Sequence, residues 1–390
     1  MARAGDVPGP FAMSGLLAAP LHASHVRYVI RLSLLSALLI VAAARCGQGG
    51  AALGTDPDPP PQTPPPTEPG PAPPSPGPTP PAPGPDLACG DYPHTRVVPV
   101  GSSVELTQAL ARAQPGDLLR LRDGVYTGGW TIAISGTPQL PITLCGTRQA
   151  LLDAGSIDQR DVITLKASYW TLAGFSVTGG LRGIYTARAS HNVLENLEIY
   201  GIGQEAVHWR VFSSHNVLRG SLIHDTGLVI AEFGEGVYIG QYRGHWCGTT
   251  GCQPDRSDSN QVIDNVIGPN VTAEHIDAKE GTTGGTIQGN RFDGNGLVQT
   301  RDWIDSWVEI NGNGYTVRDN QGRVSPRDGF QVMVGLAGWG NDNVFAGNTA
   351  DVRAGGFGFR VDAARTTGNR IACDNQVLAA AAGFSSPPCR

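Results

Sequence analysis

Short runs of alternating apolar and polar residues recur between Tyr169 and Val377, and turns rich in Gly, Ser and Asn separate them. In such a run every second side chain points to the same face of a strand, so one strand alone buries only half of its residues. Stacking successive repeats supplies the missing cover. The runs that align by this pattern begin at Ile184, Val207, Val237, Ile276, Val308, Phe330 and Phe357.

The repeats differ in length, because the aligned starts lie 23, 30, 39, 32, 22 and 27 residues apart. A fixed rung that carries loops of variable length produces such spacing. The pattern therefore predicts an all-β solenoid, a coil of stacked β rungs.

A column of asparagines supports the same coil. Asparagines that close the second run of each repeat are spaced by 25, 30, 28 and 27 residues, at Asn265, Asn290, Asn320, Asn348 and Asn375. Asn tolerates left-handed backbone, and its amide can bond the same group one rung away. We expect an asparagine ladder at this bend; the alternative is that Asn only marks turns.

A short helix is expected before the coil. Ser102 and Glu105 have capping-box spacing, and apolar residues follow at helical intervals until Pro115 and Gly116 end the run. Such a helix would cover the open edge of the first rung.

The sequence of residues 1–88 predicts an export signal followed by a spacer. Arg27 and Arg31 precede a 13-residue apolar run that ends in three alanines at 42–44, which is typical of a signal peptide rather than a membrane span. We predict a signal peptide over residues 1–44, with Met1 or Met13 as its start.

The remaining chain divides into a Pro-rich linker over residues 45–88 and one β-helix domain over residues 89–390. Cys46 leaves lipid anchoring open as an alternative. We expect a secreted or cell-envelope protein that is a monomer and has no membrane span once the signal is removed.

Composition narrows the function classes. The chain has 390 residues, 53 Gly, 16% charged residues and a net charge of -6, which fits a turn-rich β protein and gives no basic surface for nucleic acid. Six cysteines follow residue 46, and an even number in an exported chain indicates disulfides. Proximity in the sequence favours the pairs Cys247–Cys252 and Cys373–Cys389, and elimination leaves Cys89–Cys145.

The start of the domain resembles a known group. Pro-Gly-Asp at 115–117, Asp-Gly-Val-Tyr at 123–126 and Pro-Ile-Thr-Leu at 141–144 are similar to the entry of secreted right-handed parallel β-helix proteins of the pectate-lyase-like superfamily. The resemblance spans the folded part, and it implies a right-handed parallel β-helix. Function is not implied, because the superfamily includes lyases, hydrolases and epimerases.

The alignment places chemistry-bearing side chains in columns on one exterior face, with rungs about 4.8 Å apart. We expect this face to be an active or binding groove, against the alternative of an ordinary polar, solvated strand face. The three columns read Tyr185, His208, Tyr238, Asp277, Glu309, Gln331; Arg210, Gly240, Lys279, Asn311, Met333, Arg360; and Glu205, Glu235, Glu274.

The first hypothesis is a lyase that breaks a uronate polymer by β-elimination. Glu205, Glu235 and Glu274 would hold Ca²⁺ through oxygen ligands, and no organic cofactor is expected. Lys279 would act as the base and His208 is a further catalytic candidate. The polymer would be an acidic polysaccharide.

The segment Glu274–Lys279 is similar to the motif of the chondroitinase B and alginate lyase family. The resemblance implies Glu274 as a Ca²⁺ ligand, Lys279 as the base and Arg301 as the acid. Two positions depart from the family pattern: Thr272 stands where the family has its second calcium Glu, and Arg301-Asp302-Trp303 stands for Arg-His-Gly.

Two alternatives remain at this stage. In a glycoside hydrolase, Asp277 and Glu309 would be the paired carboxylates. In a non-catalytic carbohydrate-binding or adhesion module, aromatic residues such as Tyr185, Tyr238, Trp209 and Trp246 would hold a glycan. The long loops at 241–260 and 293–305 would wall the groove. Candidate substrate-binding residues are Arg210, Tyr238, Asn311, Trp246 and Trp303.

Overall fold

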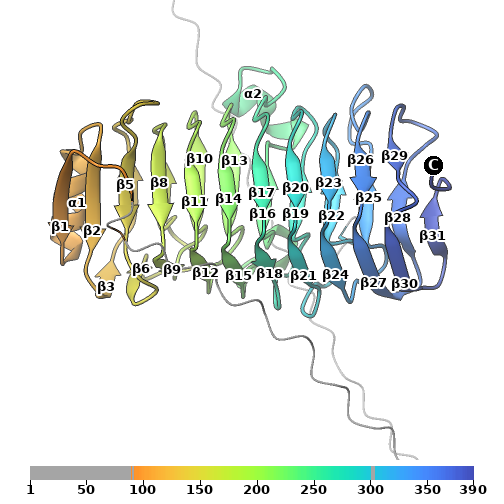
Figure 1. The fold of residues 1–390 in the computed structure, drawn as a ribbon, viewed down its shortest axis with the longest axis horizontal. Helices are drawn as coiled ribbons and strands as arrows, with labels where there is room; N and C mark the ends of the chain where they lie inside the picture. The colour runs from red at the N-terminus through yellow and green to blue at the C-terminus, as the bar shows by residue number, and fades with distance from the viewer. Residues whose placement is uncertain (1–88, 90–91, 300–303) are drawn as a thin grey trace, which may run out of the picture. The chain divides into compact units, whose positions relative to one another are not determined.

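The computed structural model describes residues 89, 92–299 and 304–390. The predicted signal peptide (1–44) and linker (45–88) lie outside the described residues, and so do Arg301 and Trp303. The described chain forms a parallel β-solenoid, as the alternating pattern predicts, with three long sheets along its length (Figure 1).

In all three sheets, neighbouring strands come from successive turns of the coil. Figure 1 places the first strands of the chain at one end of the solenoid and the last strands at the other.

The first sheet holds β1 (Arg96–Val100), β2 (Asp117–Leu121), β5 (Ile142–Cys145), β8 (Trp170–Ala173), β11 (Val193–Glu195), β14 (Val217–Arg219), β17 (Gln261–Ile263), β20 (Thr286–Gln288), β23 (Thr316–Arg318), β26 (Val344–Ala346) and β29 (Arg370–Ile371).

The second sheet, called the site sheet below, holds β4 (Trp130–Ile132), β7 (Ile163–Leu165), β10 (Ile184–Ala187), β13 (Val207–Arg210), β16 (Val237–Ile239), β19 (Ile276–Ala278), β22 (Val308–Ile310), β25 (Phe330–Val332), β28 (Phe357–Val361) and β31 (Gly383–Ser386).

The third sheet holds β3 (Gly124–Thr127), β6 (Ala150–Asp153), β9 (Ser176–Thr178), β12 (Glu198–Tyr200), β15 (Leu222–His224), β18 (Val266–Ile267), β21 (Arg291–Asp293), β24 (Gln321–Arg323), β27 (Thr349–Ala354) and β30 (Gln376–Ala380).

The register of the site sheet agrees with the sequence alignment except at its last step. Ile184, Val207, Val237, Ile276, Val308 and Phe330 pair in that order. Phe330 then pairs with Phe359, not with Phe357. The sequence alignment was wrong here because β28 begins two residues early, and a shift of two keeps the same side chains inward. Arg360 therefore belongs to the column of Gln331 rather than that of Lys279.

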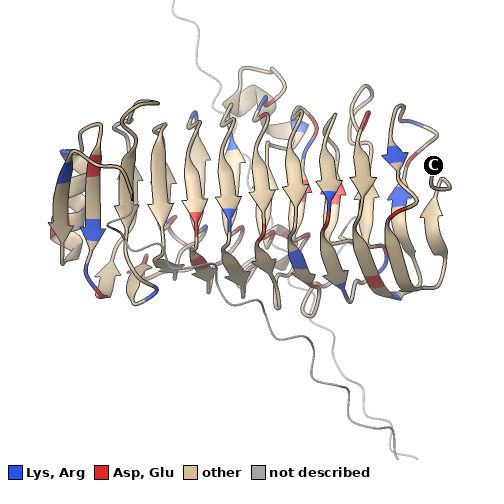
Figure 2. Ribbon diagram, viewed as in Figure 1, with Lys and Arg blue, Asp and Glu red and all other residues tan. Residues whose placement is uncertain are grey.

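The interior is a continuous stack of apolar side chains. Trp209 is completely buried in it, so it cannot stack on a glycan, and the expectation that it is one of the glycan-binding aromatic residues was wrong. Phe330 and Phe359 stack with ring centroids 5.1 Å apart. Few charged residues lie on the strands (Figure 2), as the low charged fraction indicates.

One helix lies between the first two strands of the coil, and three short helical elements lie in loops near its middle. Helix α1 (Ser103–Ala111) has Ser102 as its N-cap, which accepts a hydrogen bond from the Glu105 amide at 3.2 Å, and Leu106 is buried against the interior. The others are η2 (Ala231–Phe233), η3 (Arg243–His245) and α2 (Trp246–Thr249).

The asparagine ladder is confirmed. From Asn290 onward, the side-chain oxygen of each Asn accepts from the backbone N–H of the Asn one rung earlier, at 2.9–3.0 Å between donor and acceptor. The same oxygen also accepts from the preceding side-chain amide. This arrangement satisfies buried backbone groups on successive turns of the coil from Asn265 to Asn375. Its members are Asn265, Asn290, Asn320, Asn348 and Asn375.

Three disulfides join the pairs expected from the sequence: Cys89–Cys145, Cys247–Cys252 and Cys373–Cys389. Within the described residues, no helix is long and apolar enough to cross a membrane.

Candidate active site

The exterior face of the site sheet carries the predicted column of polar side chains. Backbone register aligns Tyr185, His208, Tyr238, Asp277 and Glu309 on consecutive rungs. The sequence predicted that this column faces solvent, yet Asp277 is 2% and Glu309 is 5% exposed. The expectation of free exposure was wrong because neighbouring side chains pack against the column: Lys279 Nζ lies 2.5 Å from Asp277 Oδ2, and Asn311 donates to Glu309 Oε1 at 2.7 Å. The column is therefore a partly desolvated site rather than a solvated strand face.

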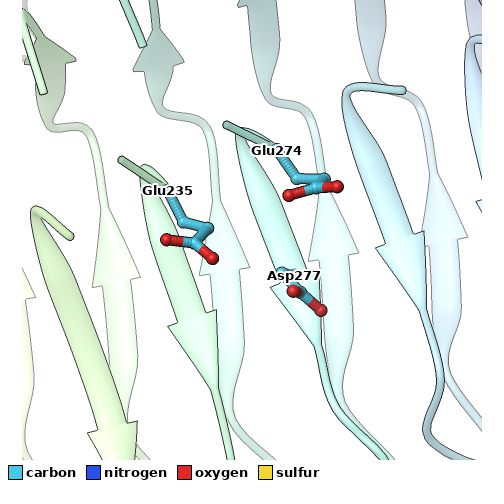
Figure 3. Close-up of side chains that lie close together, drawn as sticks. All are labelled: Glu235, Glu274 and Asp277. Carbon is cyan, nitrogen blue, oxygen red and sulfur yellow. The ribbon is translucent and has the colours of Figure 1, made fainter. Parts of the chain in front are cut away.

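Asp277 of this column and two buried glutamates outside it form a carboxylate cluster, defined here as Glu235, Glu274 and Asp277. Each offers an oxygen within 4.8 Å of the other two. Glu235 and Glu274 precede β16 and β19, and Figure 3 shows them side by side on neighbouring turns, with Asp277 further along its strand. Glu235 Oε2 and Asp277 Oδ1 are buried without a hydrogen-bond partner in the described part of the chain. Oxygen atoms left in this way fit a hard cation or protons.

Burial sets the charge of the cluster. Burial and the neighbouring carboxylates Glu205 and Asp277 raise the pKa of Glu235 well above its usual value. Burial together with Glu309 and Asp277 does the same to the pKa of Glu274. Burial also raises the pKa of Asp277 to about 7, although the charge of Lys279 opposes it. Burial and mutual repulsion therefore favour the protonated forms of Glu235 and Glu274, while Lys279 favours the ionised form of Asp277.

Lys279 lies at the centre of the site. It follows β19, and its Nζ is 2.5 Å from Asp277 Oδ2 and 3.8 Å from Glu309 Oε1. The same ammonium lies 5.6 Å from the centroid of the Tyr238 ring. Burial alone would lower the pKa of Lys279, but Asp277, Tyr238 and Glu309 outweigh burial and hold this pKa well above its usual value. Lys279 is therefore a charged ammonium in this form of the protein.

Glu205 lies outside the carboxylate cluster, although the sequence grouped it with Glu235 and Glu274. Its Oε1 is 3.1 Å from His208 Nδ1. Burial would raise the pKa of Glu205, but His208 overcomes this effect and lowers it. Asp277 takes the third place in the cluster instead, because its side chain projects from the strand toward the same point. The sequence placed Asp277 in a different role and had no signal for this exchange.

His208 links two tyrosines. Its ring meets Tyr238 edge-on at 4.5 Å and Tyr185 at 5.7 Å between centroids. Its Nε2 is 3.1 Å from the carbonyl oxygen of Gly240. Tyr185, His208 and Tyr238 thus form a continuous aromatic row that leads to Lys279.

The other predicted residues have mixed positions. Asn311 lies beside Lys279 and donates from Nδ2 to Glu309 Oε1 at 2.7 Å. Arg210 lies two rungs away, with its guanidinium 5.5 Å from the Tyr185 ring centroid. Trp246 does not offer its ring to the groove as expected: it is 7% exposed and donates to the Gln241 carbonyl at 2.8 Å, because it packs beneath its own loop.

One residue of the site region was missed from the sequence. Glu280 directly follows Lys279, is almost fully buried, and accepts a hydrogen bond from the Arg243 amide at 3.0 Å. It ties the loop that carries α2 to the site sheet. Its place immediately after Lys279 was the signal that could have identified it.

Comparison with solved structures shows that the chain is similar to polysaccharide lyases. The chain is 35% identical to the alginate lyase from Paenibacillus sp. str. FPU-7, with a TM-score of 0.69, over 75% of this chain and 97% of that protein. Pectate lyase Pel9A matches at 16% identity with a TM-score of 0.50, over 78% of this chain and 83% of that one, which supports the fold alone. No family model and no curated protein sequence matches.

Proposed function

The chain belongs to the parallel β-helix polysaccharide lyase family of the Paenibacillus alginate lyase, and from this premise we propose that it cleaves a uronate polymer, alginate first among those to test, by β-elimination. The observation that carries the proposal is the contact of Lys279 with Tyr238 beside Asp277, in a desolvated site on the exterior of the site sheet. This elimination requires one group that takes a proton and a nearby group that gives one.

The elimination removes the proton on the carbon next to the sugar carboxylate and breaks the bond to the glycosidic oxygen. Tyr238 as its phenolate would take that proton, and the electron pair would form the carbon–carbon double bond. The ammonium of Lys279 would give a proton to the departing oxygen. A proton passed from Tyr238 to Lys279 would then restore both groups.

This assignment differs from the base role that the resemblance implies for Lys279. Asp277 and Glu309 hold the Lys279 proton, since they raise the pKa of the ammonium, so donation suits it better than abstraction. Burial raises the pKa of Tyr238 well above its usual value, and Lys279 opposes that rise. A phenolate of high pKa is rare but strongly basic.

Ca²⁺ fits the carboxylate cluster by its chemistry, because buried oxygens of Glu235, Glu274 and Asp277 converge and two of them have no other partner in the described residues. These three residues would hold the ion. When bound, it would neutralise the carboxylate of the reacting uronate.

The hydrolase alternative fits less well. Asp277 and Glu309 lie on adjacent rungs, but the ammonium of Lys279 lies close to both carboxylates. A retaining hydrolase needs one of the pair as a free acid and the other as a nucleophile.

Arg301 and Trp303 lie outside the described residues. We propose Arg301 as the acid that the resemblance implies, and Trp303 as a substrate-binding residue.

Absorbance screening on uronate polymers tests the proposal. A lyase releases unsaturated uronates that absorb in the ultraviolet, and alginate, pectate and chondroitin cover the main uronate types. Release of absorbing product from one of them supports the proposal. Release of reducing ends without this absorbance would favour the hydrolase.

We also propose that residues 1–44 are a signal peptide, that 45–88 form a linker to the domain at 89–390, and that the protein is a secreted or envelope-associated monomer. Three disulfides support export, because such bonds persist in oxidising compartments. We propose as well that the coil is right-handed and that α1 caps its first rung. N-terminal sequencing of exported protein tests the cleavage site.

A further inference from the structure

Arg210 shares a row with Lys279. Trp209 pairs with Ile239, and Ile239 pairs with Ala278, so the residues that follow them in the chain, Arg210, Gly240 and Lys279, fall on three consecutive rungs. At about 4.8 Å for each rung, the backbones of Arg210 and Lys279 are about 10 Å apart. Two cationic residues thus lie along the coil axis on one face of the solenoid.

No side chain of this row stands between them. Gly240 occupies the middle rung with a φ of +81°, and a Cβ at this position would come within 2.5 Å of Thr282 Cγ2. Both the conformation and the close approach require glycine. The row therefore places no side chain of its own between Arg210 and Lys279, and Thr282 packs against the Gly240 backbone there.

The guanidinium of Arg210 has an N–H group, at Nε, for which the described residues offer no hydrogen-bond acceptor. In the part of the chain that the structure describes, Arg210 makes no ion pair, and its buried Nε has no hydrogen-bond partner. Arg182, on the same tyrosine, instead pairs with Asp161 at 2.7 Å. A buried N–H without a partner is costly, so an acceptor from a ligand would stabilise it.

An aromatic ring completes the feature. The Tyr185 ring has Arg182 4.0 Å and Arg210 5.5 Å from its centroid. These contacts hold the ring at the outer face, one rung from Arg210. A planar guanidinium beside a fixed ring suits a sugar that carries a carboxylate, because the guanidinium binds carboxylates through two parallel hydrogen bonds.

Resting on the proposed function, we propose that Arg210 and Tyr185 form a second carboxylate subsite, where Arg210 binds a uronate of the same polymer that lies away from the bond cleaved at Lys279. The subsite favours polymers that present a second carboxylate away from the cleaved bond over polymers that carry a single uronate.

The test measures binding and turnover separately. Binding of alginate, and of the same polymer with its carboxyls reduced to alcohols, is measured by calorimetry in the Lys279→Ala background, alone and with Arg210→Gln. Arg210→Gln is expected to weaken binding of the acidic polymer by about tenfold or more, and to leave the weak binding of the reduced polymer unchanged. The matched control is Arg219→Gln, whose residue pairs with Glu195 on the first sheet.

In the otherwise wild-type enzyme, Arg210→Gln is expected to raise KM for long chains more than it lowers kcat, and Arg210→Lys to recover only part of the loss. Equal binding of alginate with and without Arg210→Gln overturns the subsite. If the wild type binds through Arg210 but releases no unsaturated product, the subsite stands and the proposed lyase function fails.

Discussion

The ammonium of Lys279 lies 2.5 Å from Asp277 Oδ2 while resting 5.6 Å from the centroid of the Tyr238 ring on the preceding rung. The Lys279 ammonium thus contacts both the Asp277 carboxylate and the Tyr238 ring. The carboxylate stabilises the protonated form of Lys279, and Tyr238 is the neighbour with which Lys279 would exchange a proton.

Removing the Lys279 ammonium should stop catalysis. Lys279→Ala is expected to lower kcat by about 10²–10⁴-fold, because the leaving oxygen loses its proton donor. Ultraviolet absorbance of the unsaturated product measures the rate. Lys166→Ala, at an exposed position, is the matched control and should keep full activity. A Lys279→Ala enzyme that retains a rate close to that of the control contradicts the assignment.

The hydroxyl of Tyr238 should matter as much as Lys279, and its ring much less. Tyr238→Phe keeps the edge contact with His208 and removes the group that takes the proton. We expect kcat to fall by about 10²–10⁴-fold with little change in KM. Tyr242→Phe, at an exposed ring, serves for comparison. If Tyr238→Phe turns over at the wild-type rate, another group performs the abstraction.

Calcium binding should strengthen with pH. Protons occupy the carboxylate cluster while pH is below the Asp277 pKa of about 7, and a cation must displace them. Affinity for Ca²⁺ is expected to rise by up to about tenfold per pH unit for each proton released. Calorimetry with Ca²⁺ alone measures this dependence in wild type. A double variant, Glu235→Gln with Glu274→Gln, should lose Ca²⁺ binding. An unchanged affinity would show that these carboxylates do not bind Ca²⁺.

The free energy of unfolding of the metal-free protein should decrease as pH rises, whereas the affinity for Ca²⁺ increases. The folded pKa of Asp277 is raised from 3.8 to about 7, so its contribution is fully favourable below the unfolded pKa and is lost as pH rises through about 7. The free energy of unfolding in chelator should therefore fall over this window. Urea titrations at several pH values measure it, and Asp277→Asn should flatten the slope.

The asparagine ladder should carry much of the stability of the coil. In Asn320→Ala, the Asn290 amide loses its acceptor and the Ile287 carbonyl loses its donor, both in the interior. We expect a loss of about 2–4 kcal/mol in the free energy of unfolding, measured with denaturant. Asn295→Ala, at an exposed turn, should cost about 0.5 kcal/mol or less. Equal losses in the two variants would show that Asn marks turns only.

The fold was predictable because its information is local and periodic. Alternation with a period of two fixes which side chains point inward, and stacking repeats it, so the register from Ile184 to Phe330 follows from the sequence. The error at Phe357 arose where β28 lengthens by one full alternation. That shift leaves the pattern of inward residues unchanged and hence gives no signal in the sequence.

The site was only partly predictable for a related reason. The register predicted that Asp277, Lys279 and Glu309 lie together. It did not predict how deeply these side chains are buried. Whether a carboxylate joins Glu235 or turns to His208 depends on side-chain conformation, which explains the exchange of Glu205 for Asp277. Trp246 failed as a groove residue because the packing of an inserted loop does not follow the period of the coil.

The most direct test of the central claim is the mass of the product formed from alginate in isotopically labelled water. Elimination adds no water across the broken bond, so the account predicts unsaturated oligosaccharides that are lighter than hydrolysis products by one water and carry no oxygen label at the cleaved ends. Saturated oligosaccharides that contain the label would contradict it.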